Sequence, residues 1–260
     1  MISVDELLKY YPENQRGFRE FILREYLQYK ILQIIFDDPA RSKQLCFLGG
    51  TCLRMVHGNT RFSEDIDFDN VGLDEKDFDK IADTIKQQLE REGYAIEIKT
   101  VYKGAFHCYI RFPSLLFQHG LTGHQEQKIL IQLDTEPQNF SFTPEKFIVN
   151  KFDVFTEIPV TPIDILLAQK FYTIVNRKRS KGRDFFDVVF LLGKGAKPDY
   201  RYLKFKLNVE TGTALKERVL QTCAKLDMNE MARDVSPFLF EAADARKVAM
   251  FVQYIKQVDL

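Results

Sequence analysis

The sequence predicts an α+β protein in which a mixed sheet with flanking helices is followed by an all-helical C-terminal part. Short apolar or alternating runs between residues 44 and 135 indicate strands, and helix-spaced apolar residues separate them. From residue 163 onward the spacing is mostly helical. Thr161 and Pro162 suit a helix start, because Thr can cap a helix and Pro fits its first turn. We therefore expect a boundary near residue 155, with domains 1–155 and 156–260.

The individual elements follow from the same patterns. Apolar residues at helical spacing predict a long N-terminal helix over residues 17–37. An apolar run at 44–48 ends in Gly49–Gly50, which predicts a buried strand and a tight turn. Further strands are expected at 65–69, 95–103, 105–112 and 128–135. Further helices are expected at 51–57, 73–91, 163–176, 184–192, 214–226 and 241–257.

The composition excludes several classes of protein. The chain has 260 residues, with 37 Lys and Arg against 37 Asp and Glu. This balance argues against a polybasic binder as a description of the whole chain. With 45% hydrophobic residues and mixed charges, disorder is not expected either. Neither the scattered cysteines nor the histidines have metal-site spacing, so we predict no zinc site, no disulfide and no catalytic histidine.

The sequence shows no sign of membrane association. No apolar stretch approaches the roughly 20 residues that span a bilayer. The N-terminus lacks the basic region and apolar run of a signal peptide. We expect a soluble, cytoplasmic protein with reduced thiols.

Charge is unevenly distributed along the chain. Residues 170–206 contain eleven Lys and Arg but only three Asp, an excess of eight positive charges. Aromatic residues interleave with the last of these cations, at Tyr200, Tyr202 and Phe205. Such a run is typical of a surface that binds a polyanion, with rings on which unpaired bases could stack. The same pattern also suits a solvated helix face with core aromatics.

Two acids one residue apart are the strongest candidates for chemistry. On a strand, Asp65 and Asp67 would point to the same side, close enough to hold one or two divalent ions. Asp134 lies at the end of another predicted strand and could bring a third carboxylate. Mg²⁺ prefers such oxygen ligands together with substrate phosphates. Alone, the pair would also fit a solvated strand face.

The turn at Gly49–Gly50–Thr51 strengthens this interpretation. Glycines between a strand and a helix let the backbone approach a phosphate, and the Thr51 hydroxyl can add a hydrogen bond. By itself the turn could be merely structural.

Two blocks of sequence carry a resemblance to a known family. The first is Leu48–Arg54 followed by residues 61–68, RFSEDIDF; the second is Leu167–Lys170 followed by residues 181–187, KGRDFFD. Together they resemble the AbiEii/AbiGii-type (MenT-like) nucleotidyltransferase toxins of type IV toxin–antitoxin systems, within the DNA polymerase β-like superfamily. The resemblance covers roughly residues 40–195 and implies a polymerase β-like core.

The resemblance also implies roles for individual residues. Asp65 and Asp67 would ligate Mg²⁺, in a site that suits two ions, and the second domain would complete the nucleotide pocket. Lys170 would contact the phosphates of the NTP, Asp184 or Asp187 would complete the pocket, and Asp134 would be a general base. The residues expected to bind nucleotide are Gly49, Gly50, Thr51, Arg54, Ser63 and Arg183.

We therefore expect transfer of NMP from an NTP to an acceptor hydroxyl, with release of pyrophosphate. Characterised members of the family suggest that the acceptor is a tRNA 3′ end, and that a separately encoded antitoxin restrains the enzyme. Two alternatives stay open: the acceptor could be a small molecule or a protein, or the chain could bind nucleotide or a partner without catalysis.

Overall fold

The computed structural model describes residues 2–260 and divides the chain into two compact units. The first, here called the sheet unit, comprises the chain up to residue 58, residues 62–139 and residues 144–160. The second, the helical unit, comprises residues 59–61, 140–143 and 161–260. The main division falls between Val160 and Thr161, and two short segments from the N-terminal part belong to the helical unit.

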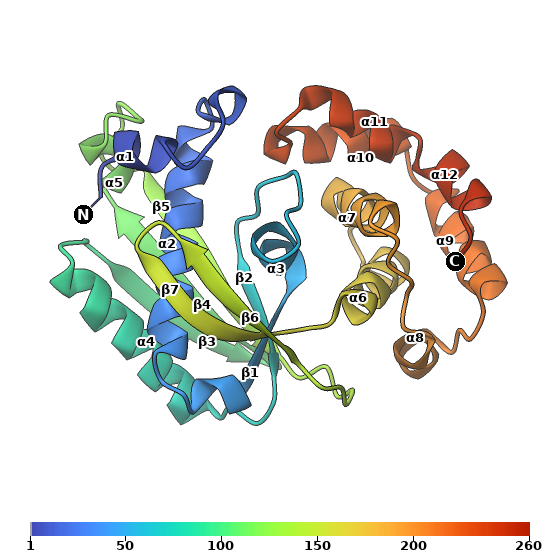
Figure 1. The fold of residues 1–260 in the computed structure, drawn as a ribbon, viewed down its shortest axis with the longest axis horizontal. Coiled ribbons are helices and arrows are strands. Elements are labelled where there is room, and N and C mark those ends of the chain that lie inside the picture. The colour runs from blue at the N-terminus through green and yellow to red at the C-terminus, as the bar shows by residue number, and fades with distance from the viewer. Residues whose placement is uncertain (1) are drawn as a thin grey trace. The chain divides into compact units, whose positions relative to one another are not determined.

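The sheet unit is built on one mixed seven-stranded sheet with the order β3-β4-β5-β2-β1-β7-β6 (Figure 1). Strands β2 and β5 are parallel, as are β1 and β7, and the other neighbours are antiparallel. The strands are β1 (Leu45–Leu48), β2 (Ile66–Asn70), β3 (Glu97–Lys103), β4 (Ala105–Pro113), β5 (Lys128–Glu136), β6 (Glu145–Lys151) and β7 (Val154–Val160). This arrangement confirms the predicted α+β class with a mixed sheet.

Strands β6 and β7 are absent from the sequence prediction, which placed a domain boundary inside β7. They form an antiparallel hairpin at the edge of the sheet. Ile148 and Phe155 project from it into solvent, with 56% and 66% of their surfaces exposed. Because apolar residues occur on both faces of the hairpin, the simple in–out alternation that identifies a strand is lost.

Two long helices cover one face of the sheet. These are α2 (Arg19–Phe36) and α4 (Glu75–Arg91), and α2 lies within the long N-terminal helix predicted over residues 17–37. Phe36 of α2 lies 5.8 Å from Phe68 of β2, and Phe78 of α4 lies 5.5 Å from Phe106 of β4, measured between ring centroids. Shorter helices are α1 (Val4–Leu8), α3 (Gly49–Met55) and α5 (Leu115–Gln118). Alternate residues of β2, β4 and β5 therefore face away from α2 and α4.

The helical unit is built around two adjacent helices, α6 (Ile163–Asn176) and α7 (Gly182–Gly193), whose apolar faces are buried. Its other helices are α8 (Tyr200–Leu207), α9 (Gly212–Cys223), α10 (Met228–Val235), α11 (Arg246–Ala249) and α12 (Phe251–Gln257). The single helix predicted over 241–257 is wrong. A 3₁₀ turn comes first, and the backbone of Met250 (φ −95°, ψ 10°) separates α11 from α12. Phe251, at the start of α12, packs against Phe185 of α7 with ring centroids 4.9 Å apart.

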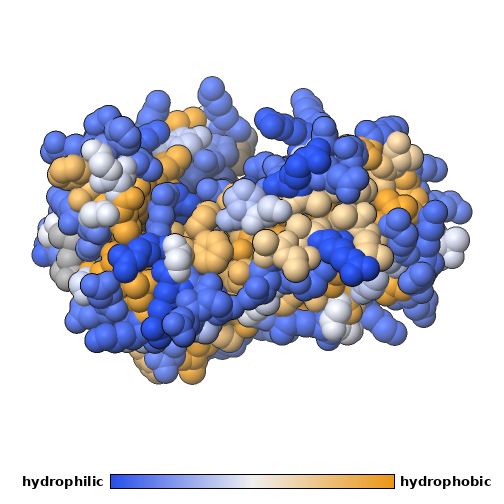
Figure 2. Space-filling view, turned by 90° about the horizontal axis from the view of Figure 1, so that it is seen from above, coloured by the Kyte–Doolittle hydropathy of each residue, from blue (hydrophilic) through white to orange (hydrophobic). Residues whose placement is uncertain are grey.

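The surface is largely polar. Hydrophilic residues predominate on the face shown in Figure 2, with smaller apolar patches among them. Within residues 2–260, no helix has the length and apolar character needed to cross a membrane. Cys46, Cys52, Cys108 and Cys223 are buried, and no disulfide joins cysteines within residues 2–260.

Candidate active site

The sheet places three polar side chains in a row. Asp67 of β2 lies opposite Asp134 of the parallel strand β5, and Asp134 lies opposite His107 of β4. Residues directly opposite one another project from the same face of a sheet. This row is on the face away from α2 and α4, because neighbouring Phe68 and Phe106 are on the helix-covered face. The predicted third carboxylate therefore does share a face with Asp67.

Asp65 is placed differently from the prediction. The strand begins at Ile66, one residue later than expected, so Asp65 lies in the segment leading into β2. Its backbone carbonyl accepts a hydrogen bond from the Thr51 hydroxyl. Across residues 2–260, no group of three His, Cys, Asp or Glu side chains is arranged to hold a metal ion by itself. Any ion at Asp65 and Asp67 would need further ligands from a substrate or water.

Asp134 is held by two neighbours. Its Oδ1 lies 2.7 Å from Nδ1 of His107, and the Gln132 amide donates to both carboxylate oxygens at 2.9 Å. His107 is about one quarter exposed and so is Asp134, at 26% and 27% of their side chains. The sequence analysis did not select His107, because no spacing in the sequence links it to Asp134. Only the antiparallel register of β4 and β5 brings the two together.

The glycine turn packs directly against the acid strand. Gly49 has φ +82°, and a Cβ at this position would overlap the carboxylate of Asp67. The Thr51 side chain is fully buried, and its hydroxyl is donated to the Asp65 carbonyl. The predicted contact of Thr51 with a triphosphate would therefore have to come from its backbone, whereas its hydroxyl joins α3 to the acid segment.

Gly49→Ala should disturb the acid segment, because the added methyl group meets Asp67 and the residue must keep a positive φ. We expect the variant to fold with reduced stability and to lose most of the NMP transfer that the resemblance implies. Gly58→Ala is a matched control, because Gly58 also has a positive φ (+73°) but nothing within 4 Å of a Cβ. Thermal unfolding and initial rates measure the two effects. Equal activity of the two variants would contradict a role for the contact between Gly49 and Asp67.

Arg54 of α3 occupies a buried ionic cluster. Its Nε donates to Oε2 of Glu25 at 2.8 Å, and Lys151 lies 2.7 Å from Oε1 of the same carboxylate. The Tyr11 hydroxyl donates to Glu25 as well, at 2.7 Å. Burial alone would raise the pKa of Glu25, but the charges of Arg54 and Lys151 outweigh it and lower that pKa. The predicted contact of Arg54 with nucleotide would have to break this cluster, so we assign Arg54 to anchoring α3 on α2.

Ser63 lies in the segment before β2. Its side chain is half-buried, and its carbonyl accepts a hydrogen bond from the Gln28 amide at 3.2 Å. The same amide donates to the Glu64 carbonyl at 2.9 Å. Helix α2 thereby fixes the backbone that carries both Ser63 and the following acids.

In the helical unit, Lys170 lies between two carboxylates. Its Nζ is 2.8 Å from Oδ2 of Asp187 and 3.3 Å from Oδ1 of Asp184. Burial by itself lowers the pKa of Lys170, but the two carboxylates outweigh it and hold the pKa above its ordinary value. The ammonium group is therefore a fixed cation at neutral pH.

Asp187 is fully buried, and its carboxylate accepts four hydrogen bonds or ion pairs. Arg61 contributes two of them, from Nε at 2.7 Å and from Nη2 at 2.6 Å. The others come from Asn59 at 2.8 Å and from Lys170. Burial raises the pKa of Asp187, yet Arg61 and Lys170 more than compensate and lower it to about 2.

Asp184 lies nearer the surface. Besides Lys170 it pairs with Arg177, whose Nη1 is 2.6 Å from Oδ2, and the Arg177 side chain is 39% exposed. Arg183 lies 4.7 Å over the ring of Phe238. The guanidinium on Asp187 therefore belongs to Arg61, which the sequence analysis quoted within the first motif without assigning it a role.

The basic run is only partly available as a stacking surface. Tyr202 is 1% exposed and belongs to the core, so its predicted role in stacking is wrong. Arg201 pairs with Asp199, and Lys204 pairs with Glu210. Phe205 is 55% exposed, with Lys206 5.2 Å from its ring centre. The helical periodicity of α8 turns Tyr202 inward and Phe205 outward, which residue types alone do not show.

The fold has been seen in two solved structures from Helicobacter pylori. JHP933 matches with a TM-score of 0.54 at 16% identity, covering 91% of this chain and 91% of its own. A second protein, described as a nucleotidyltransferase, gives the same TM-score and identity over 94% of this chain and 96% of its own. These likenesses agree with the mixed α+β fold described above.

A family model confirms the narrower resemblance. The model described as "Nucleotidyl transferase AbiEii toxin, Type IV TA system" matches residues 30–252. The chain belongs to this family, and it is a nucleotidyltransferase of a type IV toxin–antitoxin system. Such membership implies a separately encoded antitoxin. No curated protein sequence matches the chain.

Proposed function

We propose that the protein transfers an NMP from an NTP, with Mg²⁺, to the 3′ hydroxyl of an RNA, specifically a tRNA, and thereby acts as a toxin. Family membership supports the reaction class. The arrangement of Asp67, Gly49 and Asp134 on one face of the sheet is the observation that carries the proposal. The charge of the helical unit supports an RNA acceptor, because residues 161–260 contain eighteen Lys and Arg but twelve Asp and Glu.

The residues present fit a magnesium ion that is shared with substrate. Mg²⁺ in enzymes of this kind usually binds one or two carboxylates and completes its shell with phosphates and water. Asp65 and Asp67 would supply the two carboxylates, and Gly49 leaves the space that the Asp67 carboxylate occupies. The lack of a three-ligand cluster in residues 2–260 agrees with an ion held jointly by protein and NTP. When bound, the ion would stabilise negative charge on the attacking and leaving oxygens.

In the proposed reaction, the acceptor oxygen forms a bond to the α-phosphorus, and the bond from that phosphorus to the bridging oxygen breaks. Pyrophosphate leaves and the acceptor hydroxyl loses its proton. Asp134 and His107 are suited to take this proton, because they share a short hydrogen bond on the face that carries Asp67. The Gln132 amide would hold the Asp134 carboxylate in position.

The helical unit would supply positive charge. We assign Lys170 to the NTP phosphates, where a fixed cation offsets charge that grows on the leaving group. Of the two acids, Asp184 is the better candidate for direct action, because Asp187 has no exposed surface and four donors already satisfy it. Asp187 would instead position Lys170.

The experiment that tests this function uses α-labelled NTPs with total RNA and purified protein. We expect label on tRNA, with one nucleotide preferred, and release of pyrophosphate. Mass analysis of the RNA then locates the addition at the 3′ end. Label on protein or on a small molecule would replace the RNA acceptor with one of the alternatives. Nucleotide binding without any turnover would show that this chain binds nucleotide but is not a catalyst.

The basic loop before α7 should recruit the acceptor. Lys178 and Arg179 are exposed there, whereas Arg177 is paired with Asp184 and is left unchanged. Lys178→Glu with Arg179→Glu should raise the KM for tRNA and reduce its salt dependence, because each phosphate contact contributes about 0.7 to the logarithmic salt slope. The KM for NTP should stay near wild type.

Lys225→Glu with Arg233→Glu reverses two exposed charges elsewhere in the same unit and serves as the control. If both double variants gave the same salt-dependent KM for tRNA, the loop would have no specific part in recruitment.

A further inference from the structure

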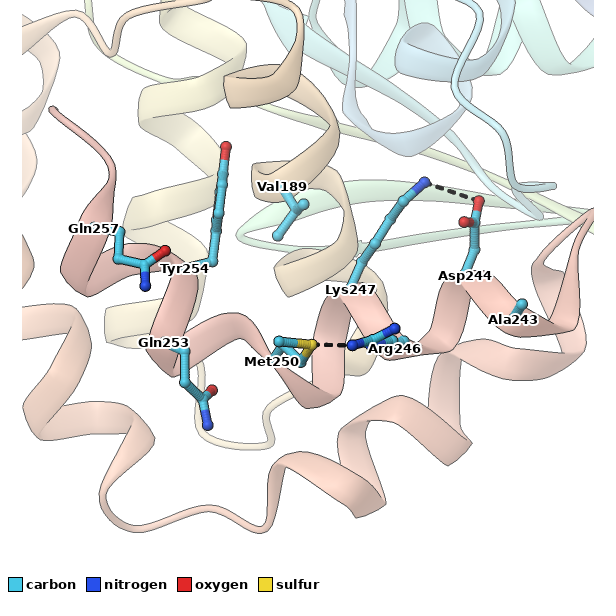
Figure 3. A pocket seen from close by; sticks show the side chains of 9 residues that line it. All are labelled: Val189, Ala243, Asp244, Arg246, Lys247, Met250, Gln253, Tyr254 and Gln257. Atoms are coloured by element: carbon cyan, nitrogen blue, oxygen red, sulfur yellow. Dashed lines mark hydrogen bonds and ion pairs between the residues drawn. The ribbon is translucent and has the colours of Figure 1, made fainter.

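A groove in the helical unit has a lining unlike that of the Lys170 network. Its volume is about 390 Å³, and it lies between Val189 of α7 and the segment that contains α11 and α12. Figure 3 shows the ring of Tyr254 and the side chain of Lys247 on either side of Val189. A second hollow of about 410 Å³ shares these three residues and extends the groove to Phe190 and Lys194.

The groove lies on the far side of α7 from Asp187. Val189 is two residues further along the helix, which is about 200° around its axis. The groove is therefore separate from the cluster of Asp184, Asp187 and Lys170 described above.

Cations without matching acids surround this groove. Among residues 2–260, neither Lys194 nor Arg246 has a carboxylate within ion-pair distance. Lys247 forms an ion pair with Asp244, at 2.9 Å. Arg246 donates only to the sulfur of Met250, at 3.1 Å, which is a weak acceptor. Lys194 lies 5.4 Å over the ring of Phe190. Three positive groups thus face one acid, and an anionic ligand would compensate the charge.

The rest of the lining suits a planar, polar-edged group. Tyr254 is half-buried and contributes a ring to the wall. Gln253 and Gln257 are exposed at the margin, and their amides can donate and accept. Val189 and Met250 supply apolar surface. An aromatic wall, amides and a cationic margin are together the features with which proteins bind unpaired nucleotides.

We propose that this groove binds a single-stranded segment of the acceptor RNA, with a base against Tyr254 and neighbouring phosphates on Lys194, Arg246 and Lys247. The inference rests on the proposed function, which makes RNA the acceptor. An acidic peptide would use the cations but not the ring and the two amides, so charge and lining together favour RNA. The groove would hold the body of the acceptor and raise its affinity without taking part in the chemical step.

The test measures binding of a short fluorescein-labelled single-stranded RNA to the full chain by anisotropy. Tyr254→Ala should raise the Kd about ten-fold or more, whereas Tyr254→Phe, which keeps the ring, should stay near wild type. The triple change of Lys194, Arg246 and Lys247 to Gln should also lower the logarithmic salt slope by about 2. The control triple changes Lys216, Lys225 and Arg233 to Gln in the same unit and should bind as wild type.

The outcomes separate this inference from the proposed function. Equal affinity and salt slope in the groove and control triples would overturn the groove as an RNA site. Binding of a polyglutamate peptide that the groove triple abolishes, with RNA affinity unchanged, would assign the groove to an acidic protein segment. RNA binding that depends on Tyr254, without NMP transfer to any RNA, would retain the groove and refute the acceptor assignment.

Discussion

Asp65→Asn and Asp67→Asn should each reduce NMP transfer by about 100- to 1,000-fold, because each removes a carboxylate proposed to hold the Mg²⁺ that would offset phosphate charge in the transition state. Asp67 is the more informative position. Its carboxylate lies against Gly49 and its backbone is fixed between β1 and β5, so the Asn side chain should occupy the same space. The fold should persist, and the loss should be confined to kcat and to dependence on Mg²⁺.

The control for these variants is Glu136→Gln, which neutralises an exposed acid at the end of β5. Glu136 lies opposite Asp69, two residues along the sheet from the row of Asp67 and Asp134. The Glu136→Gln variant should transfer NMP at the wild-type rate. Initial rates over a Mg²⁺ series, with thermal unfolding of each protein, give both comparisons. A variant of Asp67 with the wild-type rate and Mg²⁺ dependence would remove the metal assignment.

Those features of the candidate site that are local in the sequence could be predicted. Asp65 and Asp67 lie one residue apart in one motif, and Gly49 directly follows an apolar strand, so pattern and resemblance select them together as candidates. The central helices and five of the strands follow from periodicity for the same reason. The hairpin of β6 and β7 was not predicted because Ile148 and Phe155 face solvent and interrupt the polar positions of its pattern.

The contacts made over long sequence separation could not be predicted. Arg61 reaches Asp187 across 126 positions, and Lys151 reaches Glu25 across the same separation. Nothing in a single sequence pairs these charges, since the chain has 37 residues of each sign to choose from. His107 joins Asp134 only through strand register. Residue type therefore indicates a charge, but the fold decides whether it meets substrate or a buried partner.

The cluster around Asp187 should dominate the stability of the helical unit. Asp187→Asn removes the buried charge that Arg61 and Lys170 share. Lys170 keeps Asp184, but Arg61 loses the carboxylate that it binds with two nitrogens. Breaking such a buried pair destabilises a protein by about 3–5 kcal/mol. For a chain of this size we therefore expect the Tm to fall by roughly 6–20 °C. Thermal unfolding followed by circular dichroism measures the change.

Arg201→Ala provides the comparison. Arg201 also grips a carboxylate with two nitrogens, that of Asp199, but its side chain is 78% exposed. Exposed ion pairs contribute little to the free energy of unfolding, because water screens the charges and ordering the long side chain is unfavourable. The Tm of this variant should stay close to that of the wild type. Similar losses in both variants would show that burial does not distinguish the two pairs.

The pH dependence gives an independent test of the same cluster. In the folded protein the pKa of Asp187 is lowered to about 2, below the ordinary value for an aspartate. A group with a depressed folded pKa adds stability above its unfolded pKa and loses it as the pH falls through the folded value. The difference in Tm between wild type and Asp187→Asn should therefore be constant above about pH 5 and shrink between pH 4 and pH 2. A difference that remained undiminished at pH 2 would show that the Asn variant loses packing or hydrogen bonds rather than the charge of Asp187.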